Sequence, residues 1–396
     1  MKEAVLITDG EQRAALATVR SLGRCGYRCI LTSADGRSLA GASRYAAADH
    51  ALPPPLNQPE QFAEAVAELV RREGAALVLP IAEPAMLALL AQREALSPAR
   101  VPFPDLATFR DLSNKALLLD AAPACGIAVP AQHTLRQVAD LAAIPEDGLR
   151  FPIVAKPARS VAEADGRRYK LGVSHAASRA ELAQALEGLP AAAYPVLLQE
   201  RIVGPGVGIF LLLWRGELVA QFAHRRLREK PPSGGVSVYR ESIAADPELV
   251  ARSRALLERF GWQGVAMVEY KLDERTGTPY LMEVNGRFWG SLQLAIDAGV
   301  DFPALLADRA LGRRPAPVLD AQLGVRSRWW WGDVDHLLAR LRRSDAELAL
   351  PPGAPRRARA LLDFGTLWRP GDRNEILRWS DPAPFFRESR LWLSGK

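Results

Sequence analysis

Two glutamates and an asparagine in the second half of the chain lie in segments that have the residue pattern of β-strands. Glu269 lies in one run of strand-forming residues, Glu283 and Asn285 lie in the next, and turn-forming residues 273–279 separate the two runs. This order predicts a β-hairpin. If its loop is symmetric about Thr276, Glu269 and Glu283 face each other. The two-residue period of a strand then places Asn285 on the same face as Glu283.

Two carboxylates placed directly opposite each other repel and destabilise a sheet. A hard divalent cation removes that repulsion, and two carboxylates with an amide oxygen form a suitable magnesium site. The alternative is an exposed acidic pair neutralised by Lys271 and Arg287. The hairpin by itself leaves both interpretations open, because its register is inferred.

Two lysines occupy positions from which they could bind phosphate. Lys156 follows the apolar run 151–155, so it either extends out of the sheet to solvent or reaches into a pocket. Lys115 lies at the start of the predicted helix 114–125, where a solvated surface lysine is the simpler interpretation. Neither lysine identifies a ligand by itself.

A basic segment, 224–237, carries Arg225 and Arg228 among five basic residues, His224 included, ahead of a Pro-Pro-Ser-Gly-Gly bend. Successive amides in a Gly-Gly bend can bind an anion, and arginine offers a planar fork to carboxylate or phosphate. A solvated basic strand end is the alternative.

The elements that must position these residues fall into three parts. Residues 1–112 alternate strand and helix signals, which predicts a parallel sheet covered by helices. The first turn, 8–12, lacks the spaced glycines of a dinucleotide site, so we expect a scaffold there. Residues 113–315 mix strands and helices in an order that favours an α+β unit with antiparallel sheets.

Residues 316–396 differ in composition from the rest of the chain. Residues 313–396 hold 16 Lys and Arg against 10 Asp and Glu, which accounts for the whole net charge of +6, and six of the nine tryptophans follow residue 328. We expect a helical extension, with a helix at 334–343, whose tryptophans pack on the catalytic body. Contact with an acidic polymer or a membrane surface is the alternative, and nucleic acid is disfavoured.

The composition is that of a globular protein, with 48% hydrophobic and 24% charged residues. No apolar run reaches the length of a membrane span, and the N-terminal sequence lacks the pattern of a signal peptide. The three cysteines, Cys25, Cys29 and Cys125, lack both a disulfide framework and zinc spacing, so we expect buried thiols in the cytoplasm.

The segment 281–287, preceded by Val268-Glu269-Tyr270, is similar to the metal-binding end of the ATP-grasp superfamily, which includes biotin carboxylases, carbamoyl-phosphate synthetases and D-alanine–D-alanine ligases. The resemblance implies that Glu269, Glu283 and Asn285 hold magnesium, with manganese as the alternative ion. It also implies that Arg287 contacts the γ-phosphate or a substrate carboxylate.

The same resemblance assigns a nucleotide site. Lys115 and Lys156 are similar to the two phosphate-binding lysines, and Gln199, Glu200 and Ile202 lie in a strand that resembles the adenine-binding hinge. One feature departs from the family. The loop 158–170, which should be glycine-rich and cover the phosphates, has a single glycine, and the cations Arg159, Arg167, Arg168 and Lys170 are available to cover them instead.

The basic segment 224–237 resembles a loop of bacterial carboxylate–amine ligases that borders the acyl-phosphate site, so Arg225 and Arg228 join Arg287 as candidate catalytic residues. The resemblance implies an α/β, Rossmann-like pre-ATP-grasp domain at 1–112, and an α+β ATP-grasp domain with a small lobe at 113–200 and a large lobe at 201–315. The helical Trp- and Arg-rich extension, 316–396, follows.

The implied function is ATP-dependent ligation of a small carboxylate to an amine through an acyl phosphate. A bicarbonate-using carboxylase or carbamoyl-phosphate-type enzyme is one alternative, and a non-catalytic ATP-binding module is another. A protein kinase or Walker-type ATPase is disfavoured, because neither His-Arg-Asp nor Gly-Lys-Ser/Thr occurs. The identity of the acid and amine and the oligomeric state do not follow from the sequence.

Overall fold

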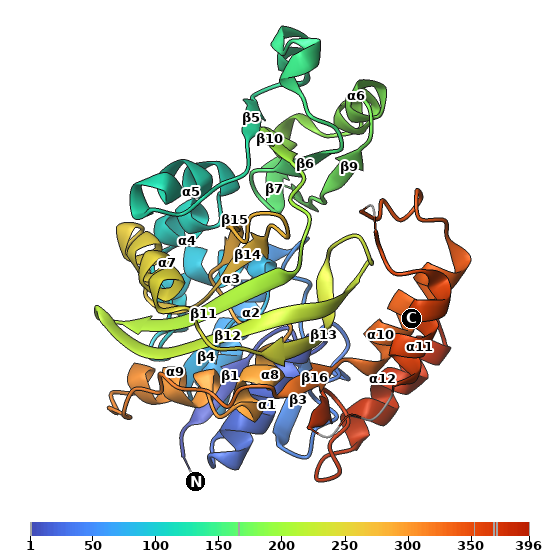
Figure 1. Ribbon diagram of the computed structural model, residues 1–396. Coiled ribbons are helices and arrows are strands. Elements are labelled where there is room, and N and C mark those ends of the chain that lie inside the picture. The colour runs from blue at the N-terminus through green and yellow to red at the C-terminus, as the bar shows by residue number, and fades with distance from the viewer. Residues whose placement is uncertain (1, 165–166, 352, 367–368, 370, 396) are drawn as a thin grey trace.

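The computed structural model describes every residue except 1, 165–166, 352, 367–368, 370 and 396. Its N-terminal part is a four-stranded parallel sheet in the order β3-β2-β1-β4, with helices packed around it (Figure 1). β1 is a central strand and β4 an edge strand, and nearly all the residues of both are buried. The elements are β1 Ala4–Ile7, α1 Arg13–Arg24, β2 Arg28–Ser33, β3 Ala46–Ala51, α2 Pro59–Glu73, β4 Ala75–Leu79, α3 Glu83–Ala91, η1 Arg93–Leu96 and α4 Leu106–Leu112.

A smaller, four-stranded antiparallel sheet follows, in the order β5-β10-β6-β9, and a separate two-stranded hairpin, β7-β8, lies beside it. Asn114 caps the helix that enters this region, because its side chain accepts hydrogen bonds from the first-turn amides. The elements are α5 Lys115–Ala121, η2 Ala122–Cys125, β5 Gln132–Leu135, η3 Val138–Ala143, η4 Glu146–Gly148, β6 Ile153–Pro157, β7 Val161–Ala164, β8 Arg167–Lys170, β9 Ser174–Ala176, α6 Arg179–Glu187, η5 Ala191–Ala193 and β10 Val196–Glu200.

The third part is a seven-stranded sheet in the order β15-β14-β11-β12-β13-β16-β17. The two-residue turn Arg215-Gly216 joins β11 to β12, and both residues have positive φ, which suits a tight hairpin. The elements are β11 Gly206–Trp214, β12 Glu217–Lys230, β13 Val236–Ser242, α7 Pro247–Arg259, β14 Gly264–Leu272, β15 Pro279–Asn285, α8 Leu292–Asp297 and α9 Phe302–Ala310.

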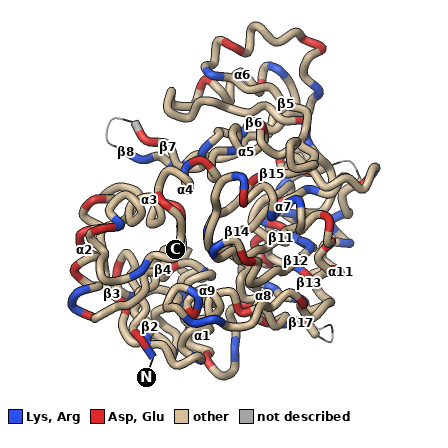
Figure 2. Tube along the Cα trace, turned by 90° about the vertical axis from the view of Figure 1, so that its left-hand side faces the viewer, with Lys and Arg blue, Asp and Glu red and all other residues tan. Residues whose placement is uncertain are grey.

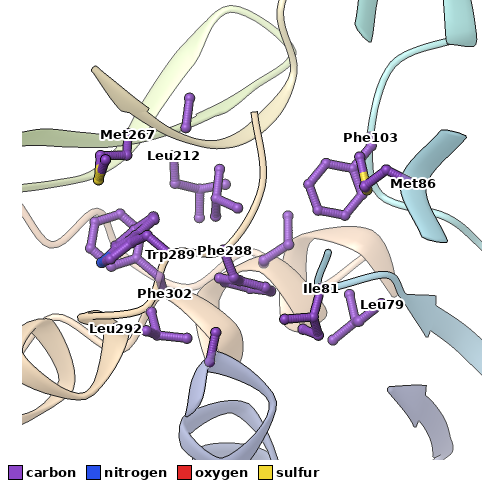
Figure 3. Close-up of a cluster of buried hydrophobic side chains, with 14 of the residues drawn as sticks. Leu79, Ile81, Met86, Phe103, Leu212, Met267, Phe288, Trp289, Leu292 and Phe302 are labelled. Atoms are coloured by element: carbon purple, nitrogen blue, oxygen red, sulfur yellow. The ribbon is translucent and has the colours of Figure 1, made fainter. Parts of the chain in front are cut away.

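Apolar side chains form two separate cores in this architecture. The main core is shared by the N-terminal sheet and the seven-stranded sheet: Leu79, Met86 and Phe103 pack in one cluster with Leu212 and Phe288 (Figure 3). A second, smaller core lies within the β5-β10-β6-β9 sheet and α6, and includes Leu135, Leu182 and Leu198. The N-terminal and seven-stranded parts therefore share one hydrophobic core, and the small lobe has its own.

The C-terminal extension adds both helices and strands. It contains β16 Arg326–Arg328, α10 Trp330–Arg342, α11 Arg357–Gly365, β17 Asp372–Asn374 and α12 Ala383–Leu393. α10 contains most of the predicted helix 334–343 but begins about one turn earlier. β16 pairs with β13, and β17 pairs with β16, so the extension completes the large sheet. Three-residue strands carry too little periodicity to be recognised in a sequence.

Buried ion pairs attach the extension to both other parts of the body. Arg20 on α1 donates through Nε to Asp381 Oδ2 at 2.7 Å, and both side chains are 2% exposed. Arg228 on β12 forms a salt bridge with Asp333 on α10 at 2.6 Å, and Asp333 is fully buried. The extension therefore contacts the N-terminal part and the large sheet at once.

The described tryptophans of the extension pack mostly against protein. Trp329 lies against the Arg13 guanidinium, 3.9 Å from the ring centroid, and Trp331 stacks on Trp392 with ring centroids 4.1 Å apart. Trp379 is 87% exposed, and Trp368 lies outside the described residues. The expected packing on the body is confirmed for Trp329, while contact with an acidic polymer or membrane surface stays a prediction.

Cys29 is buried in β2, and Cys25 and Cys125 are partly buried, all three as free thiols. Within the described part of the chain, no helix combines the length and the apolar character that crossing a membrane requires.

Candidate active site

The predicted hairpin is formed by β14 and β15, and Glu269 lies directly opposite Glu283 as expected. The strand pairing differs in one detail from the symmetric loop assumed in the sequence analysis. Beyond Glu269 the register shifts by one, so that Tyr270 pairs with Leu281, and a β-bulge absorbs the difference. Asn285 lies on the same face as Glu283, because its Nδ2 donates to Glu283 Oε1 at 2.9 Å.

Glu283 lies in a strongly cationic environment. Lys115, at the start of α5, is buried with its Nζ 3.3 Å from Glu283 Oε2 and 3.2 Å from Ser160 Oγ. Burial alone raises the pKa of Glu283, but Lys115, the Asn285 hydrogen bond and Lys156 outweigh it, so the pKa lies well below its ordinary value. Glu283 is therefore an ionised carboxylate at neutral pH.

Glu269 has one close cationic partner, Arg226 of β12, whose Nη2 donates to Glu269 Oε2 at 2.5 Å. Arg226 also contacts Glu229 at 2.8 Å. Burial raises the pKa of Glu269, Arg226 lowers it, and repulsion from Glu283 raises it again, so the net shift is upward. The two opposed carboxylates therefore repel each other in the folded protein, as a site built for a cation requires.

The donor set fits magnesium. Glu269 and Glu283 offer carboxylate oxygens, and Asn285 adds an amide oxygen on the same face, which are hard ligands suited to this ion. Among the described residues, no group of three His, Cys, Asp or Glu side chains is placed to bind a metal. The site therefore depends on the asparagine and on further oxygens that a bound nucleotide would contribute.

Lys156 lies at the end of β6 and projects toward the hairpin, with its Nζ 3.7 Å from Met282 Sδ. Burial lowers the pKa of this lysine to about 8, against the opposing effects of Glu283 and Glu269. Lys156 therefore turns toward the hairpin and does not extend out of the sheet to solvent.

This pKa predicts how nucleotide binding depends on pH. Below about pH 8 Lys156 is protonated and attracts phosphate, and above it the charge is lost. We expect the affinity for magnesium and AMP-PNP, a non-hydrolysable ATP analogue, to fall between pH 7.5 and 9.5, approaching about tenfold per pH unit. Titration calorimetry across this range measures the effect.

Two variants serve as controls for this titration. Lys156→Met should bind the analogue weakly at pH 7 with a flatter profile, and Lys156→Arg should keep its affinity at pH 9.5. A wild-type profile that matches Lys156→Met would show that Lys156 does not bind the phosphates.

The predicted adenine-binding strand is β10. Gln199 and Lys156 share one face of the small sheet, because Lys156 pairs with Leu197, two residues from Gln199. Gln199 is buried and donates to Gln132 Oε1 at 2.8 Å, while its own Oε1 has no partner within the described part of the chain. Glu200 and Ile202 are partly buried where β10 ends. Their nucleotide roles stay predictions.

Arg287 and Glu283 line a small polar pocket, called here the reaction pocket, where the N-terminal part, the small lobe and β15 meet. Arg287 Nη2 donates to Asn285 Oδ1 at 3.0 Å, and Nη1 donates to the Phe288 carbonyl. The described lining residues are Glu83, Phe109, Ser113, Lys115, Ser160, Glu283, Val284, Asn285, Gly286 and Arg287.

The structure does not bring Arg225 and Arg228 to this pocket. Arg225 projects from the opposite face of β12 to Arg226 and donates to Glu241 at 3.0 Å. A bulge between Arg226 and Arg228 keeps Arg228 on that opposite face, over the Tyr239 ring and paired with Asp333. Arg226 is the arginine of this segment that reaches the acidic pair.

Three pocket or near-pocket residues lack a sequence motif: Glu83, Ser160 and Arg226. Glu83 begins α3, just after β4, and burial raises its pKa while Arg287 and Lys115 lower it, with a net upward shift. Asp9, after β1, accepts hydrogen bonds from the amides of Ile81 and Ala82 and so holds this turn. Ligands commonly bind at the carboxyl ends of parallel strands, and this rule could have identified Glu83 and Asp9 from the sequence.

Gly286 separates Asn285 from Arg287 and packs against a buried ring. A Cβ atom at this position would lie 2.4 Å from the Trp262 ring, and Trp262 is 4% exposed. We expect Gly286→Ala to destabilise the fold by about 1–3 kcal/mol and to reduce turnover, because the ring must move and the two flanking side chains move with it.

Urea unfolding and an ADP-release assay measure the two effects of Gly286→Ala. Gly172→Ala is the matched control, because a Cβ atom there meets nothing within 4 Å. Equal stability and activity in both variants would contradict the expected clash.

Known proteins share parts of this sequence and this fold. A family model described as ATP-grasp in the biosynthetic pathway with Ter operon matches residues 193–331, about a third of the chain. This segment contains the whole acidic hairpin. No curated protein matches the chain.

Solved structures share the fold at low sequence identity. The L-amino acid ligase from Bacillus licheniformis is 21% identical with a TM-score of 0.60, over 78% of this chain and 74% of that one. The biotin carboxylase complex from Campylobacter jejuni is 15% identical with a TM-score of 0.64, over 82% and 74%. The ADP complex of N5-carboxyaminoimidazole synthetase from Staphylococcus aureus is 12% identical with a TM-score of 0.62, over 82% and 81%.

The chain has the ATP-grasp fold, and the resemblance to that superfamily, predicted from the acidic hairpin, is confirmed. The expected mixed α/β architecture is present.

Proposed function

We propose that this protein is an ATP-dependent ligase that joins a carboxylate to an amine through an acyl phosphate, releasing ADP and phosphate. The observation that carries the proposal is the opposition of Glu269 and Glu283 on β14 and β15, with Asn285 beside them. Arg226 and Lys115 compensate the two carboxylates in this structure, and the oxygens of the two glutamates and the asparagine fit magnesium bound with a nucleotide.

Glu269, Glu283 and Asn285 would hold magnesium, with manganese as the alternative ion, and the metal would supply neutralisation of phosphate charge. Lys115 and Lys156 bind the phosphates from opposite sides of the cleft, and Gln199, Glu200 and Ile202 border the adenine. Phosphoryl transfer of this kind depends chiefly on positioning and on charge stabilisation.

Arg287 orients the acid substrate in the reaction pocket. An oxygen of the substrate carboxylate attacks the γ-phosphorus, the bond from that phosphorus to the bridging oxygen breaks, and ADP leaves with the electron pair. The amine nitrogen then attacks the acyl carbon, phosphate leaves, and the nitrogen loses a proton. Glu83, a buried carboxyl in the pocket with a raised pKa, is placed to bind the amine and accept that proton.

The sequence predicts Arg225 and Arg228 as catalytic residues. We assign this role to Arg226 instead, because it alone of the three contacts the acidic pair. In the absence of nucleotide it neutralises Glu269. We infer that Arg226 stabilises phosphate charge once a cation occupies the carboxylates, while Arg225 and Arg228 act only through the structure of β12.

An ADP-release screen tests the proposal. The protein is supplied with magnesium, ATP and paired acids and amines, and mass analysis identifies the product. An amide formed with stoichiometric ADP supports the ligase. ADP release that depends on bicarbonate would instead indicate a carboxylase or carbamoyl-phosphate-type enzyme, and no ADP release across a broad panel would indicate a non-catalytic ATP-binding module.

A further inference from the structure

A second cavity, of about 420 Å³, lies between the β7-β8 hairpin and helices α3 and α4. Figure 2 shows the hairpin above α3 and α4, with basic residues on β8. Three arginines from three different elements line this space, which we call the arginine cavity: Arg110 of α4, Arg159 after β6, and Arg168 of β8. Its volume suits a small metabolite.

Arg168 is the distinctive residue of the arginine cavity. Its side chain is 9% exposed, its Nε lies 3.6 Å from Glu163 Oε2, and its buried Nη1 has no hydrogen-bond partner among the residues described. Burying a guanidinium donor without a partner is costly. Glu163 does not relieve this cost, because its side chain is 56% exposed and contacts a different nitrogen. An anion in the cavity would satisfy the unpartnered donor.

The arginine cavity adjoins the reaction pocket. Glu83, Phe109 and Ser113 line both spaces. Of the residues expected to bind the nucleotide, Lys156 and Gln199 are not among the described residues that line the arginine cavity, while Lys115 lines the reaction pocket beside it. A molecule with its reacting carboxylate at Arg287 can therefore extend past Phe109 toward Arg168.

We propose that the arginine cavity binds a second anionic group of the acid substrate, a carboxylate or a phosphate, and that Arg168 is its principal ligand. The proposal rests on the ligase function and narrows its substrate class to acids with at least two negative groups. Arg159 and Arg110, which are exposed residues at the mouth of the cavity, add positive charge. Leu87 and Val161 supply apolar walls for the chain between the two groups.

The test uses pairs of acids that differ in one anionic group: glutamate with norvaline and succinate with butyrate, which are similar in size, and 3-phosphoglycerate with glycerate, which differ by the whole phosphate. Calorimetry measures binding of each acid to the full-length protein, with and without magnesium and AMP-PNP. We expect at least one dianionic acid to bind about tenfold or more tightly than its partner, and Arg168→Gln to abolish that preference. The carboxylate and phosphate pairs distinguish the two chemical groups.

Arg136→Gln, at an exposed position of the same lobe, is the matched control and should keep the preference. If Arg168→Gln fails to fold, as judged by its melting curve, Arg110→Gln replaces it, with a smaller loss expected. The proposal is overturned if no pair shows a preference, if the preference survives in both variants, or if Arg168→Gln weakens AMP-PNP binding alone, which would place Arg168 on the nucleotide.

The AMP-PNP titration distinguishes failure of the ligase assignment from failure of the arginine-cavity proposal. If AMP-PNP does not bind the wild-type protein, the proposed function fails, and the titrations without nucleotide still decide whether Arg168 selects dianionic acids.

Discussion

Replacing Glu283 by alanine is expected to lower ATP turnover by about a hundredfold or more while the protein stays folded. Glu283 is ionised, faces Glu269 across the sheet, and is hydrogen bonded by Asn285 and paired with Lys115. Its removal takes away half of the carboxylate charge proposed to hold magnesium. Loss of one group that stabilises charge in a transition state commonly costs this much.

The Glu283→Ala substitution leaves the buried Lys115 without its carboxylate partner, but Lys115 keeps Ser160 Oγ at 3.2 Å, and the repulsion between two opposed carboxylates is removed, so we expect the protein to stay folded. Turnover of the acid and amine pair found in the screen, AMP-PNP affinity and the melting temperature are measured together. Glu274→Ala, an exposed carboxylate in the turn of the same hairpin, is the control and should be fully active. Equal turnover in the two variants would refute the metal assignment.

Replacing Asp381 by alanine is expected to destabilise the protein by about 3–5 kcal/mol, the usual cost of leaving one member of a buried ion pair uncompensated. Asp381 accepts hydrogen bonds from Arg20 Nε, from Ser43 Oγ and from the Arg44 amide. Its carboxylate is 2% exposed, so water cannot replace it for Arg20. Urea unfolding of the full-length chain measures the loss.

The double variant Arg20→Met with Asp381→Leu separates charge from packing. Because it removes both charges, it should recover much of the stability lost in Asp381→Ala. Glu68→Ala, which breaks the exposed pair with Arg71, is the comparison and should cost at most about 1 kcal/mol. A loss in Asp381→Ala no larger than in Glu68→Ala would show that the extension does not depend on this contact.

The hairpin shows what a sequence can specify. Strand alternation and turn-forming residues were enough to predict that Glu269 and Glu283 face each other. The symmetric loop assumed for that prediction is not what the protein has, since the pairs beyond the bulge are offset by one. The prediction was right at the site because burial of Val268 and Val284 on the other face fixes the local register.

The basic segment shows where sequence reasoning stops. Arg225, Arg226 and Arg228 are close in sequence and chemically equivalent, and only the face of β12 separates them. A bulge, which no residue type in this segment indicates, keeps Arg228 on the face away from Glu269. The acidic partners Glu241 and Asp333, distant in sequence, then occupy Arg225 and Arg228.

The N-terminal contribution to the site could not be predicted for a related reason. Glu83 has no local motif, and its position depends on how the first sheet packs against β15. The arginine cavity likewise needs three segments to meet, so neither its volume nor the unpartnered nitrogen of Arg168 is visible in the sequence.

The division of apolar packing into two cores has a mechanical consequence. Leu118 and Leu119 of α5 belong to the main core, so Lys115 is fixed to the body that also holds the acidic hairpin. Lys156 belongs to the strand sheet with its own core. In the proposed nucleotide complex, a triphosphate bound by both lysines connects the part that contains the main core with the small lobe, and we expect nucleotide binding to close the small lobe over the site.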